Sequence, residues 1–126
     1  MFNLRGSDIP YNPVFFAYGL VTLDQVTLYI EKSKLTPEAL KYLDGVTIKG
    51  YADIFSDLTL LKTTLEAQKT KLGIDLRCNL ALEEALGGPS SVKQLRSPVT
   101  VAKAIKNETE MEGFRQSHLR DAAALV

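Results

Sequence analysis

The chain has 126 residues, a length that suits one ordinary domain with a buried core. Hydrophobic residues make up 45% and charged residues 24%, a balance that excludes a disordered or fibrous protein. Lysine plus arginine number 15 and aspartate plus glutamate number 15, so the formal net charge is zero and nucleic acid is not an expected partner.

The sequence shows no apolar run near the roughly 20 residues that cross a bilayer, and its first six residues lack the layout of a secretory signal. We therefore expect a cytoplasmic protein with no membrane partner. One cysteine, Cys78, excludes an internal disulfide and a cysteine-rich zinc site. Its position suits a half-buried apolar residue, and a reactive thiol at the start of a helix is the alternative.

The first two predicted elements are strands. Residues 14–22 are rich in aromatic and β-branched residues, which predicts a central strand. Val26, Leu28 and Ile30 then recur at every second position, the pattern of a strand with one face covered. Together the two runs predict a hairpin.

A short helix and a long one follow, separated by a strand. Thr36 and Pro37 form a helix start, and this helix ends near Gly45. Residues 46–51 predict a third strand. The face of the next helix is predicted from apolar residues at three- and four-residue steps, namely Ile54, Phe55, Leu58, Leu61 and Leu65.

The alternation of strand and helix then continues. Residues 72–76 and 92–95 are strand candidates, and residues 80–86 form a helical stretch that ends at a Gly-Gly-Pro sequence. Alternating elements favour a mostly three-layer α/β sheet over a bundle or a sandwich.

The last third of the chain predicts a long helix. Asn107 and Glu110 have the spacing of a capping box, which places the helix start there. Its apolar stripe consists of Met111, Phe114, His118, Ala122 and Leu125. The helix is still apolar at the last residue, so we expect the chain to be cut inside a larger protein.

The residues offer little for catalysis. His118 is the only histidine, and its helical spacing favours a packing role, because a metal ligand would need partners that this chain does not supply. Asp53 and Asp57 lie at a helix start, where the helix dipole explains acidic residues. We therefore predict no catalytic residue and no metal ligand.

A polar loop precedes the first strand. Residues 3–13 contain glycine and two prolines, and loops at a sheet edge often bind ligands. Arg5 and Asp8 are its charged side chains. The alternative is a tight turn in which Arg5 and Asp8 pair with each other.

The two ends of the chain resemble one known family. Residues 2–16, Phe-Asn-Leu-Arg-Gly-Ser-Asp-Ile-Pro-Tyr-Asn-Pro-Val-Phe-Phe, closely resemble the segment that begins the second-domain hairpin of eukaryotic Xaa-Pro aminopeptidases, of the creatinase or M24 peptidase family. Residues 96–121 are similar to the junction where that family's catalytic domain begins. The order of elements between these ends is similar to the creatinase-type N-terminal domain.

This resemblance implies a fold class, which is α/β with a mixed sheet flanked by helices, creatinase N-terminal-like and ribonuclease-H-like. It also implies that the sheet is incomplete at its N-terminal side and is followed by a long C-terminal helix. Residues 1–96 would form a partial accessory domain, and residues 97–126 a linker and the first helix of a truncated "pita-bread" catalytic domain.

The family is one of cytosolic metallopeptidases that remove an N-terminal residue when proline follows, using two divalent metals, often Mn²⁺. The family's ligands would lie beyond Val126, so we expect no metal in this chain and no catalysis by it alone. The implied partner is a peptide with proline in second position, and a homodimer is one assembly open to the intact enzyme. Arg5 and Asp8 are the candidate substrate-binding residues.

Two other functions remain open at this point. The chain could be a free-standing interaction or assembly module that descends from the same family. A thiol-based redox protein centred on Cys78 is the third hypothesis.

Overall fold

A computed structural model describes residues 2–125. Its strands are β1 (Ala17–Val21), β2 (Val26–Ile30), β3 (Thr47–Lys49), β4 (Leu72–Asp75) and β5 (Val92–Leu95). Its α-helices are α1 (Pro37–Tyr42), α2 (Asp53–Ala67), α3 (Leu80–Ala85), α4 (Pro98–Ala104) and α5 (Glu108–Leu125). Two short 3₁₀ helices, η1 (Lys32–Lys34) and η2 (Pro89–Ser91), precede α1 and β5.

The predicted hairpin is confirmed, but its strands exchange roles. β1 pairs antiparallel with β2, with Tyr18 opposite Tyr29, and β3 pairs parallel with β2 on the other side. β2 is therefore the central strand, and the prediction that residues 14–22 form a central strand is wrong. The prediction that β2 is covered on one face is also wrong, because Thr27 and Tyr29 are buried as well as Leu28 and Ile30.

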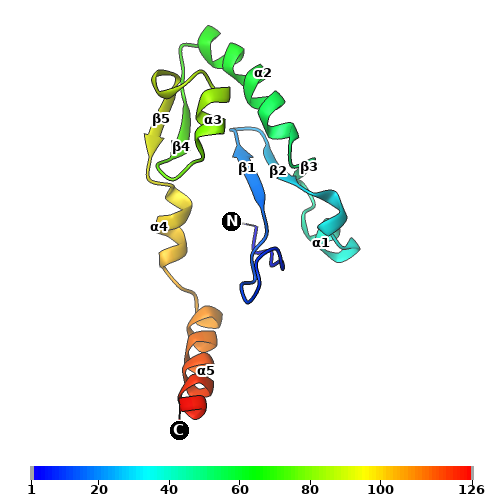
Figure 1. Cartoon of the computed structure of the whole chain (residues 1–126), viewed down its shortest axis with the longest axis vertical. Coiled ribbons are helices and arrows are strands. Elements are labelled where there is room, and N and C mark those ends of the chain that lie inside the picture. The colour runs from blue at the N-terminus through cyan, green and yellow to red at the C-terminus, as the bar shows by residue number, and fades with distance from the viewer. Residues whose placement is uncertain (1, 126) are drawn as a thin grey trace.

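The strands form two sheets rather than the single sheet expected from the sequence. β1, β2 and β3 make one sheet, while β4 and β5 pair in parallel as a second. Figure 1 shows the two sheets apart, with α2 beside both. The α/β class with sheets flanked by helices agrees with the prediction.

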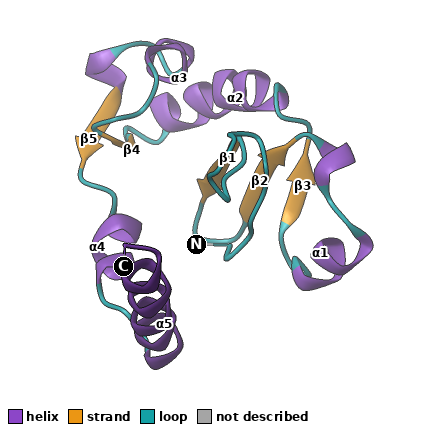
Figure 2. Ribbon diagram, turned by 60° about the horizontal axis from the view of Figure 1, so that its bottom comes forward, coloured by secondary structure: helices purple, strands orange, loops and turns teal. Residues whose placement is uncertain are grey.

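Two hydrophobic clusters lie on opposite faces of β2. The first joins Tyr29 to Ile54 and Leu58 of α2 and continues into α3 and the second sheet through Ile74, Leu82, Leu86 and Val92. The second contains Leu28, Ile30 and Leu43. Figure 2 shows α2 extending from the three-stranded sheet to the two-stranded one, so this helix provides the common layer of the fold.

A polar network fastens α2 to the first sheet. The hydroxyl of Tyr29 donates to Asp57 Oδ2 at 2.6 Å, and the ammonium of Lys49 donates to the same oxygen at 2.6 Å. The pair with Lys49, followed by the Tyr29 hydrogen bond, lowers the pKa of Asp57. Burial, with the nearby carboxylate of Asp57, raises the pKa of Tyr29, so its hydroxyl keeps its proton.

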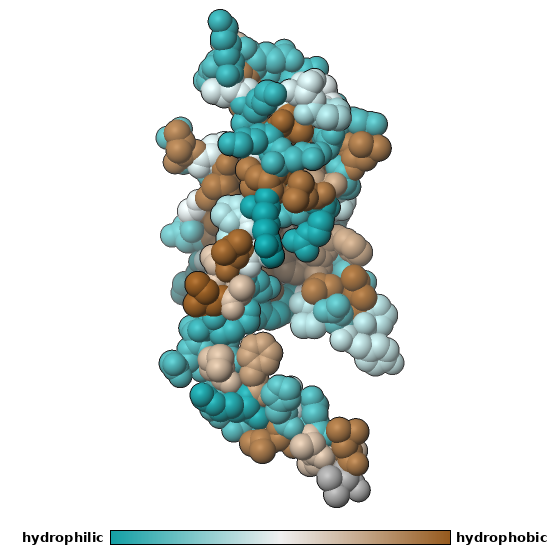
Figure 3. All heavy atoms as spheres, turned by 90° about the vertical axis from the view of Figure 1, so that its left-hand side faces the viewer, coloured by the Kyte–Doolittle hydropathy of each residue, from teal (hydrophilic) through white to brown (hydrophobic). Residues whose placement is uncertain are grey.

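The C-terminal helices form an arm. The predicted capping box is confirmed: the amide of Asn107 donates to Glu110 Oε2 at 3.0 Å, and the amide of Glu110 donates to Asn107 Oδ1 at 2.9 Å. α5 buries none of its residues, and Figure 3 shows apolar atoms exposed along this arm. His118 is exposed, so its predicted packing role is not met within residues 2–125.

Among residues 2–125, none of the helices combines the length and the hydropathy that a bilayer span requires.

We expect Asp57→Ala to lower the free energy of unfolding by about 1–3 kcal/mol at pH 7, because the change leaves the buried Tyr29 hydroxyl without its acceptor. Tyr29→Phe should cost less, since it removes the hydroxyl itself and leaves Asp57 bound to Lys49. The folded-state pKa of Asp57 lies below its ordinary value of 3.8, so the stabilisation is present above that pH and is lost as the pH falls through the folded-state pKa. Urea titrations of the two variants and the unaltered chain at pH 7 and at low pH measure these free energies. If Asp57→Ala lowered the free energy of unfolding equally at both pH values, the pH dependence would be contradicted.

Candidate functional site

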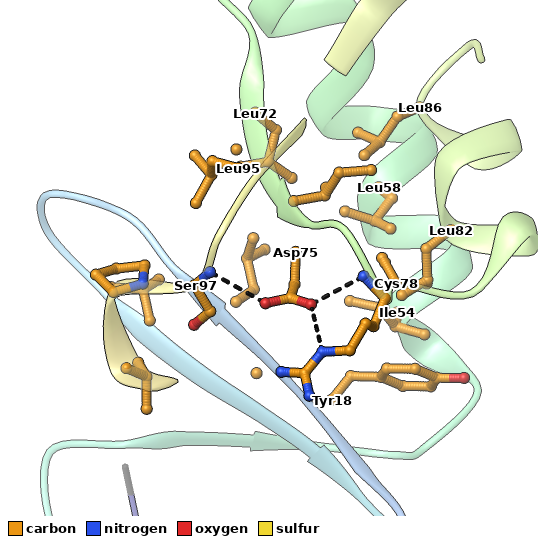
Figure 4. Close-up of a pocket in the computed structure, with 18 of the residues that line it drawn as sticks. Tyr18, Ile54, Leu58, Leu72, Asp75, Cys78, Leu82, Leu86, Leu95 and Ser97 are labelled. Carbon is orange, nitrogen blue, oxygen red and sulfur yellow. Dashed lines mark hydrogen bonds and ion pairs between the residues drawn. The ribbon is translucent and has the colours of Figure 1, made fainter. Parts of the chain in front are cut away.

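A pocket of about 610 Å³ lies between the two sheets. All residues of β1 (Ala17–Val21) and of β4 (Leu72–Asp75) line it, and we call it the β1–β4 groove. Its base is apolar and comes from Ile54, Leu58, Leu82 and Leu86 (Figure 4). Polar groups are confined to one end, where Asp75, Arg77, Cys78 and Ser97 lie.

Asp75 fastens the end of β4 to the start of α4. Its carboxylate accepts hydrogen bonds from the amide of Arg77 at 2.9 Å, from Arg77 Nε at 3.1 Å and from the amide of Ser97 at 3.0 Å (Figure 4). Arg77, and then the Ser97 amide, lower the pKa of Asp75. The carboxylate is thus ionised at neutral pH and is used as a structural acceptor.

Cys78 lies beside this carboxylate as a half-buried free thiol. Burial raises the pKa of Cys78; the Asn79 amide opposes this in part, and the carboxylates of Glu83 and Asp75 add smaller increases. A raised pKa keeps the thiol protonated and disfavours the thiol-based redox function.

An aromatic cluster joins β1 to the start of α2, and a hydrogen bond links it to the start of α3. The rings of Tyr18 and Tyr51 stack with centroids 4.9 Å apart, and Phe55 meets Tyr18 edge-on at 6.3 Å. The Tyr18 hydroxyl accepts a hydrogen bond from Asn79 Nδ2 at 2.9 Å. Asn79 also caps α3 through its side-chain oxygen. Sequence reasoning missed this cluster, because 61 positions separate Tyr18 from Asn79.

The N-terminal loop places Arg5 and Asp8 on the wall of a second pocket, of about 260 Å³. Asp8 Oδ2 accepts from the amide of Phe16 at 2.7 Å and from the ammonium of Lys34 at 2.6 Å. Lys34 is the main cause of the lowered pKa of Asp8. Arg5 instead donates to Asn3 Oδ1 and to the carbonyl of Leu4, each at 3.1 Å. The alternative in which Arg5 pairs with Asp8 therefore does not describe this loop.

Arg5 also lines a larger pocket of about 980 Å³, between the N-terminal loop, β1 and the C-terminal helices. Lys103 and Glu110 line the same pocket from the arm. Arg5 is exposed, whereas Asp8 is partly covered. The structure thus leaves Arg5 available to an incoming group and uses Asp8 to hold the loop.

The amino-acid sequence matches one family over most of its length. Residues 1–110 match the family model described as the Creatinase/Prolidase N-terminal domain. The chain belongs to the creatinase/prolidase N-terminal family. The family predicted from the two ends of the sequence is therefore confirmed.

Relatives of this creatinase/prolidase N-terminal chain carry the name probable Xaa-Pro aminopeptidase P. The protein of Sclerotinia sclerotiorum is 50% identical over 131 residues, which is 100% of this chain and 22% of that protein. The protein of Sordaria macrospora is 52% identical over 133 residues, again 100% of this chain and 22% of the relative. This chain thus spans about a fifth of the length of the curated relatives it matches.

A solved structure has the same fold. The X-prolyl aminopeptidase from Caenorhabditis elegans, described as a cytosolic enzyme with a di-nuclear active site, matches with a TM-score of 0.88 and 34% identity. The match covers 98% of this chain and 21% of that enzyme. The creatinase/prolidase N-terminal chain therefore corresponds to one part of such an enzyme.

Residues 2–125 do not present the cluster of ligands that the two-metal centre implied by the family resemblance would need. Among the residues that the structure describes, no three His, Cys, Asp or Glu side chains converge on a point where they could hold an ion. The paired acids of α2 are already engaged, since Asp53 Oδ2 accepts from the Gly50 amide at 2.8 Å and Asp57 binds Tyr29 and Lys49.

The proposed boundary between residues 1–96 and 97–126 stays a prediction. At this position the structure has the connection from β5 to α4, which the Asp75 carboxylate fastens.

We expect Asp75→Asn to loosen the start of α4, because a neutral amide is a weaker acceptor for the amides of Arg77 and Ser97. Hydrogen exchange of the Ser97 amide should become faster by about tenfold, with increased cleavage near residue 97 under limited proteolysis. Asp44→Asn, at an exposed position outside this site, is the control. Unchanged exchange at Ser97 would contradict the role given to Asp75.

Proposed function

We propose that this chain serves as the accessory domain of a Xaa-Pro aminopeptidase, an enzyme that removes the N-terminal residue of a peptide with proline in second position. The supporting observation is that the whole chain aligns with such enzymes at about 50% identity and superposes on one at a TM-score of 0.88. Its own share of the work is structural: it covers and bounds the substrate cleft, while the chemistry takes place in the rest of the enzyme.

The separation of roles follows from the side chains. A peptidase of this kind needs a metal-activated water, and activation needs several ligands at one point. The described residues form no cluster of three or more side chains that could hold such an ion. The two divalent ions, which we expect to be Mn²⁺, would then be bound by the four-fifths of the enzyme that this chain does not match. A cytoplasmic location and a homodimer of the intact enzyme are further parts of this proposal.

Arg5 and Asp8 have different parts in the proposal. Asp8 fixes the N-terminal loop by binding the Phe16 amide and the Lys34 ammonium. Arg5 is exposed beside the 980 Å³ pocket, and its remaining donors can bind a carbonyl or carboxylate of a peptide. Arg5 is thus the candidate contact to substrate, and Asp8 keeps it in place.

A free-standing interaction module is not favoured. A module that had diverged from the family could match its enzymes over only part of its length. This chain aligns over its full length with proteins named as probable Xaa-Pro aminopeptidases. The C-terminal arm also exposes apolar residues that suit a surface packed on further protein, among them Val101 of α4, Ile105 just after α4, and Phe114 and Leu119 of α5.

We expect the purified chain, with Mn²⁺ and an Arg-Pro-Pro peptide, to release no arginine, because residues 2–125 bring no set of metal ligands together. Free arginine would be followed by chromatography, with the C. elegans enzyme as the positive control. Metal-dependent release by the chain alone would overturn the non-catalytic role.

The role of Arg5 can be tested in a chimera in which this chain replaces the matching fifth of the Sclerotinia protein. Arg5→Ala should raise KM for an Arg-Pro-Pro peptide by about fivefold and leave kcat unchanged, as expected for the loss of an exposed charged hydrogen bond of about 1 kcal/mol. Lys41→Ala on the exposed side of α1 is the matched control. An unchanged KM would exclude Arg5 from substrate binding.

A further inference from the structure

A pocket of about 250 Å³ lies at the C-terminal end of α2, where residues of this helix, of the loop to β4 and of η2 meet. Leu86, which is buried, lines it from the end of α3. The other walls carry more ammonium groups than carboxylates, with Lys62, Lys69 and Lys71 against Glu66. We call it the lysine pocket. Its excess of two positive charges, in a chain of zero net charge, suits a doubly charged anion.

Lys69 has a backbone conformation that favours glycine. Its φ is 53°, and it directly follows the C-cap of α2. The Lys69 amide donates to the Glu66 carbonyl at 3.1 Å and the Thr70 amide to the Leu65 carbonyl at 2.9 Å, which is a Schellman motif. α3 ends in the same motif, but with Gly87, at φ 100°, in this position. Because a Cβ atom disfavours this conformation, the lysine makes the end of α2 less stable than a glycine would.

Gly87 leaves space for two polar groups that line the pocket. A Cβ atom at Gly87 would lie 3.1 Å from Lys62 Nζ and 2.9 Å from Ser91 Oγ. The Lys62 ammonium and the Ser91 hydroxyl therefore share one space. The hydroxyl residues Thr70 and Ser90 line the same pocket. Ammonium and hydroxyl groups are donors that bind phosphate oxygens.

The dipole of α2 does not account for these lysines. A helix dipole favours cations in the last turn of the helix, and α2 has no basic residue there. Lys62 lies before that turn and Lys69 after it. Lys62 Nζ is 3.9 Å from Glu66 Oε1, at the limit of an ion pair. Within residues 2–125, Lys69 and Lys71 form no ion pair.

We propose that the lysine pocket binds a phosphate dianion, either free or as the monoester group of a small molecule. Lys62, Lys69 and Lys71 neutralise the phosphate, and the Ser91 hydroxyl donates to one of its oxygens. The strained conformation of Lys69 is kept because it places an ammonium group at this pocket. The site does not rest on the proposed function, since its lining includes neither Arg5 nor Asp8.

The test is a titration of the ¹⁵N-labelled chain at pH 7.5 and constant ionic strength, followed by amide chemical shifts. Inorganic phosphate and glycerol 3-phosphate are the probes, and potassium chloride is the reference. We expect saturable shifts at the amides of Lys69, Thr70 and Ser91, with a Kd of about 1 mM or below. A lower Kd for glycerol 3-phosphate would assign the pocket to a monoester, and an equal or higher one to free phosphate.

Two variants separate a binding role from a structural one. Lys62→Ala should weaken phosphate binding by about fivefold, whereas Lys41→Ala, which removes the same charge from the exposed side of α1, should not. Lys69→Gly should weaken binding by about fivefold and also raise Tm by about 3 °C, because glycine relieves the strained conformation.

Three results would overturn the proposal: shifts that do not saturate, equal weakening by Lys41→Ala and Lys62→Ala, or unchanged phosphate binding by Lys69→Gly. The first comparison uses the unaltered chain and does not depend on the folding of a variant. All three would leave the proposed function standing, because that function is tested by arginine release and by KM in the chimera.

Discussion

The fold depends on the burial of β2 on both faces. Tyr29 faces α2 and is 1% exposed, while Leu28 faces the opposite cluster and is also 1% exposed. A strand of this kind needs a covering layer on each side, which α2 provides on one face, and which the N-terminal loop with Leu35 and Leu43, on either side of α1, provides on the other. The positions of β1, β3 and α2 all follow from contacts with this one strand.

The same arrangement leaves β1 at the edge of the first sheet. The apolar area that stabilises the first sheet is concentrated at β2, so β1 can remain at the border of the sheet with one side unpaired. Unpaired strand edges favour association with another strand, and natural proteins usually cover or interrupt them. The groove beside β1 has an apolar base and polar groups at one end.

Local signals in the sequence predicted most elements. The periodicity of Ile54, Leu58 and Leu65 predicted α2, and the capping residues Thr36 and Asn107 predicted two helix starts that the structure confirms. The pairing of strands was not predictable in this way, because the pattern within β1 does not encode which edges meet. A run rich in aromatic and β-branched residues suits either a central strand or an edge strand beside a groove.

The candidate site shows the same division. The loop with Arg5 and Asp8 was identified from its composition, but the partner of Asp8 is Lys34, 26 positions away. The hydrogen bond from Asn79 to Tyr18 joins residues even further apart. Contacts of this separation depend on tertiary packing, which a single sequence read by period and spacing does not contain.

Three aspartates connect parts of the chain, and their surroundings suit them to structure rather than to acid–base catalysis. Asp8 holds the N-terminal loop, Asp57 holds α2 on the first sheet, and Asp75 holds the start of α4. In each case hydrogen bonds to the charged form lower the pKa. A general acid or base that works near neutral pH needs a pKa shifted the other way, toward 7. The hydrogen bonds that make these three carboxylates effective structural acceptors therefore make them poor general acids or bases at neutral pH.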